Sequence, residues 1–217
     1  MKNLLIFSLV LLLASCTKTQ PTAPDPTDLR EQIADAYQKG QWEKVIQLTD
    51  SLVKDSVYGD LTLAYAQSLR ECGMPTRSIN VVRKELEKPE ESTKPEYLYN
   101  ELGLSSSLIG GYDAAIKAYN KALELNPQYV RSLVGLADVY ETQGDISKAL
   151  DYYEDAADLF LTHAFEKEVF AIAYRMTEID PDDPRGWYIL YQANSQCGNE
   201  DEAIDCLKKF ESLSVKN

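Results

Sequence analysis

YNELGLSSSLIGGYDAAIKAYNKALELNP, residues 99–127, and LVGLADVYETQGDISKALDYYEDAADLFL, residues 133–161, decide the fold of this 217-residue chain, because the second stretch repeats the first. A shift of 34 residues places Gly110 over Gly144 and aligns apolar and small residues along both stretches. The aligned pairs are Leu102 and Leu136, Gly103 and Ala137, Ala115 and Ala149, Tyr119 and Tyr153, and Ala122 and Ala156. Self-similarity at a fixed period of this size predicts a repeat architecture.

Each repeat is predicted to contain two amphipathic helices, since apolar residues recur at steps of three and four. Gly144 suits the left-handed backbone that ends a helix, and Asp145 then stands where a helix cap is needed. Asn199 holds the same position before the last helix, while Pro127 ends the second helix of its repeat. A single helix pair cannot bury its own apolar face, so the pairs are expected to stack.

This pattern resembles the tetratricopeptide repeat (TPR), a 34-residue pair of antiparallel helices. The resemblance implies an all-α fold, a right-handed α-solenoid of about five repeats that covers residues 27–217. Gly40, Gly73 and Gly198 mark the turns of the remaining copies. The repeats are expected at about 26–58, 59–92, 96–129, 130–162 and 184–217.

One extra helix is predicted between the fourth and fifth repeats. The interval from Gly144 to Gly198 is 54 residues, which exceeds the period by 20. Residues 163–180 fill this interval and end before Pro181. Their apolar positions, Val169, Phe170, Ala173, Met176 and Ile179, have helical spacing. The segment is therefore interpreted as the second helix of a repeat that lacks its own first helix.

The N-terminal stretch LVLLLASCTKTQPTAP, residues 9–24, contains an apolar run that stops at a cysteine. The run from Leu4 to Leu13 is apolar apart from Ser8 and follows the positive charge of Lys2. A membrane span needs about 20 residues, so ten residues are too few. The charge, the length and the small residues at its end are typical of a secretory signal.

The border of this run resembles the lipobox of bacterial lipoproteins, with Leu13, Ala14, Ser15 and Cys16 in the required order. The resemblance implies that residues 1–15 are a signal peptide, and that Cys16 receives a diacylglycerol thioether and usually an acyl chain on its amine. Residues 16–26 would then be the lipidated N-terminus and a flexible tether. Thr17, in place of the Asp that commonly retains such proteins at the inner membrane, favours the outer membrane, facing the periplasm. The alternative is a cleaved secretory signal with an incidental cysteine.

The chain is acidic, with a formal net charge of −13. Wrapping nucleic acid needs clustered Lys and Arg, so nucleic acid is not expected as a partner. Residues 130–217 carry 18 acidic and 8 basic residues, which places most of the excess in the C-terminal part. This excess indicates either solubility or a preference for a basic partner.

Catalytic chemistry has little support in the sequence. The only histidine is His163, and no nucleophile–base motif, phosphate-binding loop or metal motif accompanies it. We therefore predict no enzymatic activity, no cofactor and no metal site. Beyond Cys16, the cysteines are Cys72, Cys197 and Cys206, and none forms a C-x-x-C pair. Whether two of them form a disulfide remains open at this point.

The resemblance to TPR proteins places partner binding on the concave face, which the first helix of each repeat lines. The lysine and asparagine set of the TPRs that hold chaperone C-termini is missing. Rigid aromatic and forked donor side chains instead suit an extended peptide or a partner helix. The candidate groove residues are Arg30, Tyr37, Arg70, Tyr97, Asn100, Arg131, Asp138, Arg185, Tyr188 and Gln192.

Together these features predict a lipid-anchored TPR protein of the bacterial cell envelope that serves as a protein- or peptide-binding scaffold. The partner and the oligomeric state are not specified by any motif. The alternative is a lipoprotein that binds a small ligand or glycan through Trp187, Tyr188 and Tyr191. The position of Trp187, which matches a core position of the repeat, weakens this alternative.

Overall fold

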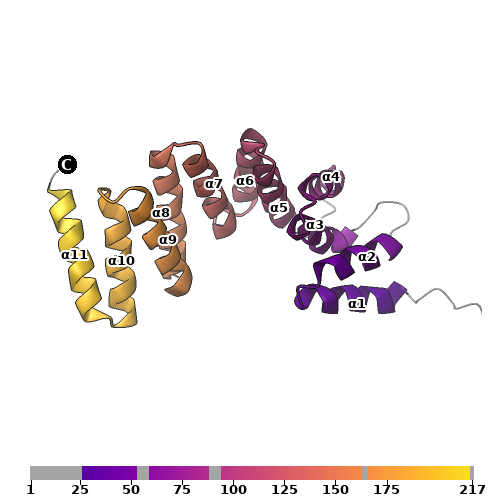
Figure 1. Cartoon of the computed structure of the whole chain (residues 1–217), viewed down its shortest axis with the longest axis horizontal. Coiled ribbons are helices and arrows are strands. Elements are labelled where there is room, and N and C mark those ends of the chain that lie inside the picture. Colours follow the sequence, from indigo (N-terminus) through magenta and orange to yellow (C-terminus); the bar gives the residue numbers. More distant parts are fainter. Residues whose placement is uncertain (1–25, 53–58, 88–93, 163–165, 216–217) are drawn as a thin grey trace, which may run out of the picture.

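The computed structural model describes residues 26–52, 59–87, 94–162 and 166–215. Within these ranges the protein is entirely helical, and successive helices pack on one another in chain order to form an elongated solenoid (Figure 1). This confirms the predicted all-α solenoid. The elements are α1 (Pro26–Gln38), α2 (Trp42–Leu52), the short 3-10 helix η1 (Gly59–Leu61), α3 (Thr62–Glu71), α4 (Pro75–Glu85), α5 (Pro95–Leu108), α6 (Tyr112–Leu125), α7 (Val130–Thr142), α8 (Ile146–Thr162), α9 (Glu166–Ile179), α10 (Pro184–Cys197) and α11 (Glu200–Ser214).

Glycine makes the turns between paired helices possible. Gly40, Gly73, Gly110, Gly144 and Gly198 all have φ values between 65° and 80°, in the left-handed region that other residues avoid. A Cβ added to Gly144 would meet no atom within 4 Å. The backbone conformation, and not a lack of space, therefore requires glycine at this turn.

One of the two predicted helix caps is confirmed and the other is wrong. The Oδ1 atom of Asp145 accepts a hydrogen bond from the backbone N–H of Lys148 at 3.3 Å, which caps α8. Asn199 occupies the cap position of α11 but forms no side-chain cap bond. Its amide instead donates to Oδ1 of Asn194 at 3.2 Å. Asn194 is buried, and a buried acceptor needs a donor more than an exposed helix end does.

The packing of α5, α6 and α7 depends on one buried tyrosine. Tyr119 of α6 is 1% exposed. A Cβ added to Gly103 of α5 would lie 2.5 Å from its Cε1 atom, and one added to Gly135 of α7 would clash with the same ring. The small residue predicted at position 103 is therefore needed for close helix approach. The sequence comparison did not identify the equal role of Gly135.

The extra helix, α9, is paired with α8. Its predicted apolar residues Val169, Ala173 and Met176 are buried. The helix packs against both α8 and α10, and α10 also packs against α8. Elsewhere the first helices of successive repeats contact each other in this way, as α3 contacts α5 and α5 contacts α7. For the C-terminal helices, α8 thus takes the place of a first helix, although it is also the second helix of the α7–α8 pair.

In the described ranges no helix is both long enough and apolar enough to cross a membrane. The predicted signal peptide, lipid-attachment residue Cys16 and tether lie outside the described residues, as does His163.

The contact between Tyr119 and Gly135 predicts a specific loss of stability. We expect Gly135→Ala to lower the free energy of unfolding by about 2 kcal/mol, because about 3 kcal/mol of overpacking exceeds the gain of about 1 kcal/mol in helix propensity. Urea denaturation followed by circular dichroism measures this value. In a Tyr119→Leu background the same substitution should be neutral or stabilising. An equal loss in both backgrounds would show that the ring is not the cause.

Candidate partner-binding groove

A cavity of about 160 Å³ lies on the face formed by the first helices of the first four pairs. Five of the predicted groove residues line it: Tyr37 of α1, Arg70 of α3, Tyr97 and Asn100 of α5, and Arg131 of α7. Gln67, Leu63, Leu104, Glu101 and Tyr129 complete the lining. The constant 34-residue period brings these residues together, because corresponding positions of stacked helices lie side by side.

A buried ion pair forms the base of this cavity. The Nε atom of Arg70 donates to Oε1 of Glu101 at 2.7 Å, and the side chain of Glu101 is only 3% exposed. Ser105 donates a second hydrogen bond to the same oxygen at 3.3 Å. Burial raises the pKa of the Glu101 carboxyl, and Arg70 only partly offsets this effect. The pair fixes the Arg70 guanidinium inside the groove and joins α3 to α5.

Neutral polar groups and two aromatic rings form the cavity walls. The Tyr37 hydroxyl donates to Oε1 of Gln67, which joins α1 to α3. The rings of Tyr97 and Tyr129 are tilted on each other with their centroids 5.0 Å apart. Burial raises the pKa of Tyr129 to about 12, so its hydroxyl stays neutral. These walls offer hydrogen-bonding groups and rigid apolar surface to an extended chain.

Arg131 supplies a cation that is not neutralised within the groove. Its side chain is exposed, and in the described part of the chain it has no ion-pair partner. Arg70, in contrast, is held by Glu101 and by Glu71 at 2.9 Å. Arg131 is therefore the groove residue best placed to bind an anionic group from a partner.

Two further predicted residues lie on the same helices but bind other side chains of the protein. Arg30 of α1 forms an exposed ion pair with Asp60 of η1. Asp138 of α7 accepts a 2.5 Å hydrogen bond from the hydroxyl of Tyr153, a buried residue of α8. Asp138 therefore contributes to the packing of α7 on α8.

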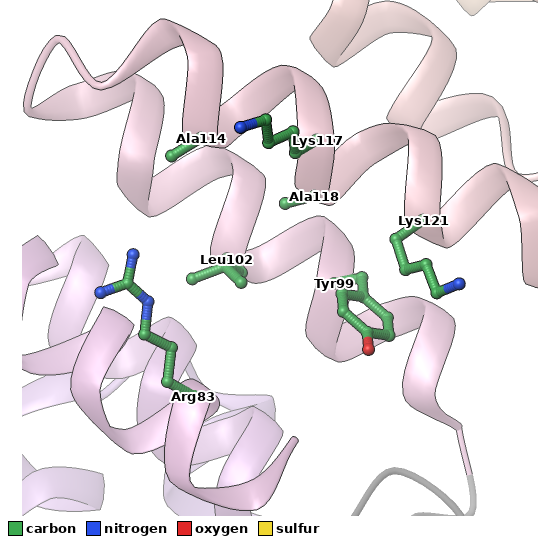
Figure 2. Close-up of a pocket in the computed structure, with 7 residues that line it drawn as sticks. All are labelled: Arg83, Tyr99, Leu102, Ala114, Lys117, Ala118 and Lys121. Carbon is green, nitrogen blue, oxygen red and sulfur yellow. The ribbon is translucent and has the colours of Figure 1, made fainter. Parts of the chain in front are cut away.

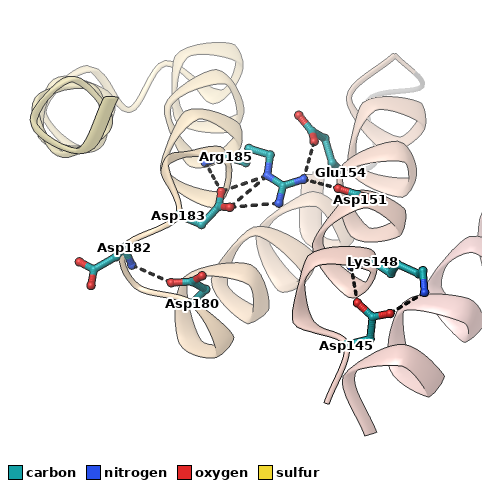
Figure 3. A network of polar contacts seen from close by, with 8 residues as sticks. All are labelled: Asp145, Lys148, Asp151, Glu154, Asp180, Asp182, Asp183 and Arg185. Carbon is teal, nitrogen blue, oxygen red and sulfur yellow. Dashed lines mark hydrogen bonds and ion pairs between the residues drawn. The ribbon is translucent and has the colours of Figure 1, made fainter. Parts of the chain in front are cut away.

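The three predicted residues of α10, Arg185, Tyr188 and Gln192, do not line this cavity. Arg185 extends to α8, where its Nη1 atom lies 2.7 Å from Oδ1 of Asp151 and 3.2 Å from Oε2 of Glu154 (Figure 3). Asp183 also binds its guanidinium, at 3.0 Å. The physical reason is the extra helix, because α10 stacks on α8 and not on α7.

Arg175 of α9 is a residue that the motif comparison missed. It forms an ion pair with Glu141 of α7 and a weaker contact of 3.2 Å with Glu178. Arg175 lies 34 residues after Glu141, just as Arg185 lies 34 residues after Asp151. The repeat period was thus a signal for both pairs, but it was applied only from one turn glycine to the next.

The aromatic residues near the C-terminus are engaged with one another and with the backbone. Nε1 of Trp187 donates to the carbonyl of Pro181 at 3.3 Å, and the Lys209 ammonium lies 5.7 Å from the Trp187 ring centroid. Tyr188 packs between Tyr191 and Phe210, at 6.0 and 5.0 Å between ring centroids. Trp187 therefore stabilises the start of α10 and offers little free surface to a sugar.

Metal and disulfide chemistry are not apparent in the described residues. These ranges contain no cluster of three or more His, Cys, Asp or Glu side chains that could bind a metal ion. Cys72, Cys197 and Cys206 are half-buried and form no disulfide. Cys206 accepts a long hydrogen bond from Asn194 at 3.9 Å.

This geometry defines a helical repeat scaffold of the TPR type, suited to protein interaction. Residues 95–162 match the tetratricopeptide repeat family, which supports the resemblance. A TPR repeat-containing protein of Methanocaldococcus jannaschii is 31% identical over 64 residues, 30% of this chain and 11% of the relative. The uncharacterised protein ycf37 of Pyropia yezoensis is 38% identical over 66 residues, 30% of this chain and 37% of the relative. The matched part thus spans well under half of these relatives.

Solved structures of MamA share the fold over most of the chain. A crystal structure of MamA protein superposes with a TM-score of 0.52 at 22% identity, over 88% of this chain and 92% of MamA. The MamA AMB-1 structure gives a TM-score of 0.53 at 16% identity, over 88% and 93%. At these identities the similarity concerns the fold alone.

The buried ion pair predicts a non-additive response to mutation. Glu101→Ala should lower the free energy of unfolding by about 3–5 kcal/mol, because it leaves the Arg70 charge partly buried without its partner. Arg70→Met combined with Glu101→Leu should recover most of this loss, as measured by urea denaturation. If the double variant loses as much as the sum of the single ones, the charges are not coupled.

Proposed function

We propose that this protein is a TPR lipoprotein of the bacterial cell envelope that binds an extended segment of a partner protein in the groove of α1, α3, α5 and α7. The most plausible location is the outer membrane, on the side that faces the periplasm. The protein would act as a scaffold or adaptor and perform no chemistry of its own.

The observation that carries the binding proposal is the convergence of Tyr37, Arg70, Tyr97, Asn100 and Arg131 on one cavity. An extended peptide has backbone groups that need hydrogen bonds and side chains that need pockets. The amide and hydroxyl groups of the cavity can meet the first need, and the Tyr97–Tyr129 surface can meet the second. A carboxylate on the peptide would pair with Arg131.

The envelope location is supported by the sequence of the N-terminus. The order Leu13, Ala14, Ser15, Cys16 would make Cys16 the first residue of the mature chain. Acyl chains contribute about 0.8 kcal/mol per buried methylene, and two or more chains give a durable attachment. The polar stretch that follows, residues 17–26, would separate the scaffold from the membrane.

The lipid anchor has a direct test. Cys16→Ala should move the protein from the membrane fraction to the soluble fraction and abolish labelling by an acyl-chain probe. Cys72→Ala is the matched control, because it removes a thiol from the folded repeats and leaves the proposed lipid site intact. A Cys16→Ala protein that stays membrane-bound and labelled would rule out the anchor.

Groove binding is tested by affinity capture from native envelopes after cross-linking. Tyr97→Ala combined with Arg131→Ala should reduce the captured partner by about tenfold or more, since aromatic and arginine anchors dominate such interfaces. Circular dichroism should still report a helical protein. The control is Tyr174→Ala with Lys84→Ala, two exposed residues outside the cavity. Equal capture by both double variants would place the partner site elsewhere.

A further inference from the structure

A second hollow, of about 400 Å³, lies on the other side of α5, between α4 and α6 (Figure 2). Its floor is apolar and contains Leu102 of α5 and Ala118 of α6. Three basic side chains surround this floor: Arg83 from α4, and Lys117 and Lys121 from α6. It shares no lining residue with the partner-binding groove. We refer to it below as the basic pocket.

The cations of the basic pocket are available to a partner. Within the described ranges neither Arg83 nor Lys117 has an ion-pair partner. Lys121 pairs with Glu124 at 2.6 Å, but both side chains are about half exposed, and such pairs contribute little. An apolar floor with a basic rim fits an anionic segment that carries one exposed apolar side chain.

The last helix of this same chain has that chemistry. Ile204 of α11 is 50% exposed. Glu200 and Asp201 lie one helical turn before it, on the same surface, and all three side chains are exposed. No ion pair engages either acid within the part of the chain that is described. The surface of α11 around Ile204 is thus an acidic patch with an apolar centre.

We infer that the basic pocket of one molecule binds α11 of a second copy of the chain. Ile204 would pack on Leu102 and Ala118, while Glu200 and Asp201 would lie against Arg83 and Lys117. The uneven charge of the chain supports this arrangement, because residues 130–217 contain 18 acidic and 8 basic residues. A contact between this part and the basic pocket brings opposite charges together, whereas most other contacts between copies would bring like charges together.

The arrangement of the solenoid requires two molecules. Figure 1 shows α11 at one end of the array, with α7 to α10 between it and the pocket helices. A molecule therefore cannot bring its own α11 onto its own pocket. Because the two surfaces are different, the contact is heterologous and produces head-to-tail chains unless the rotation closes a ring. The contact is small, so the association should be weak and should decrease with added salt.

The test is sedimentation velocity of the full protein, purified in a non-ionic detergent, over a range of concentrations and at low and high salt. The wild type should form dimers and longer species as concentration rises. Lys117→Glu and Asp201→Lys should each weaken association by about tenfold, because each places like charges opposite each other. A mixture of the two variants should associate, since the reversed Lys117→Glu pocket meets a reversed α11 surface.

The control is Lys84→Glu, which reverses an exposed charge of α4 outside the basic pocket and should leave association unchanged. Ile204→Ser tests the apolar part and should also weaken association, while circular dichroism confirms the fold. A wild type that stays monomeric at all concentrations would overturn the inference, and the pocket would then belong to another occupant. Equal effects of Lys117→Glu and Lys84→Glu, or no association in the mixture, would also overturn it. The groove variants at Tyr97 and Arg131 should not change self-association, so this result is independent of the proposed partner site.

Discussion

The structure depends on the stacking of each helix pair on the next, because no pair can bury its apolar face alone. The contact of Tyr119 with Gly103 and Gly135 is the clearest case, since a large ring fills the space that two missing Cβ atoms leave between α5 and α7. Dense packing of this kind leaves little freedom in the angle between neighbouring helices. The groove residues of α1, α3, α5 and α7 are positioned as a consequence.

The extra helix changes which helices are neighbours. A regular array would stack α10 on the row formed by α1, α3, α5 and α7. Because α9 is inserted, α10 packs on α8 and its Arg185 binds Asp151 and Glu154 there. The α7 row is instead joined to α9 by the pair of Arg175 and Glu141. One unpaired helix thus separates the last repeat from the groove of the first four.

The polar interior of the groove limits what it can bind. Arg70 is committed to Glu101, whereas Arg131 is exposed and has no ion-pair partner among the described residues. A buried pair of this kind contributes little net stability, but removing one member is costly. It therefore holds α3 and α5 in one relative position. The basic pocket lies on the opposite side of α5, so the same helix presents two surfaces of different chemistry.

The sequence by itself determined the local features: the helix periodicity, the five turn glycines, the cap at Asp145 and the groove positions of α1 to α7. These follow from backbone conformation and from a constant period, which a linear comparison detects. Only the tertiary structure decided that Asn199 binds Asn194, that Glu101 is buried against Arg70, and that α10 leaves the groove row. Each of these depends on which side chains meet across helices, and an insertion of one helix alters those meetings without altering the motif of any single repeat.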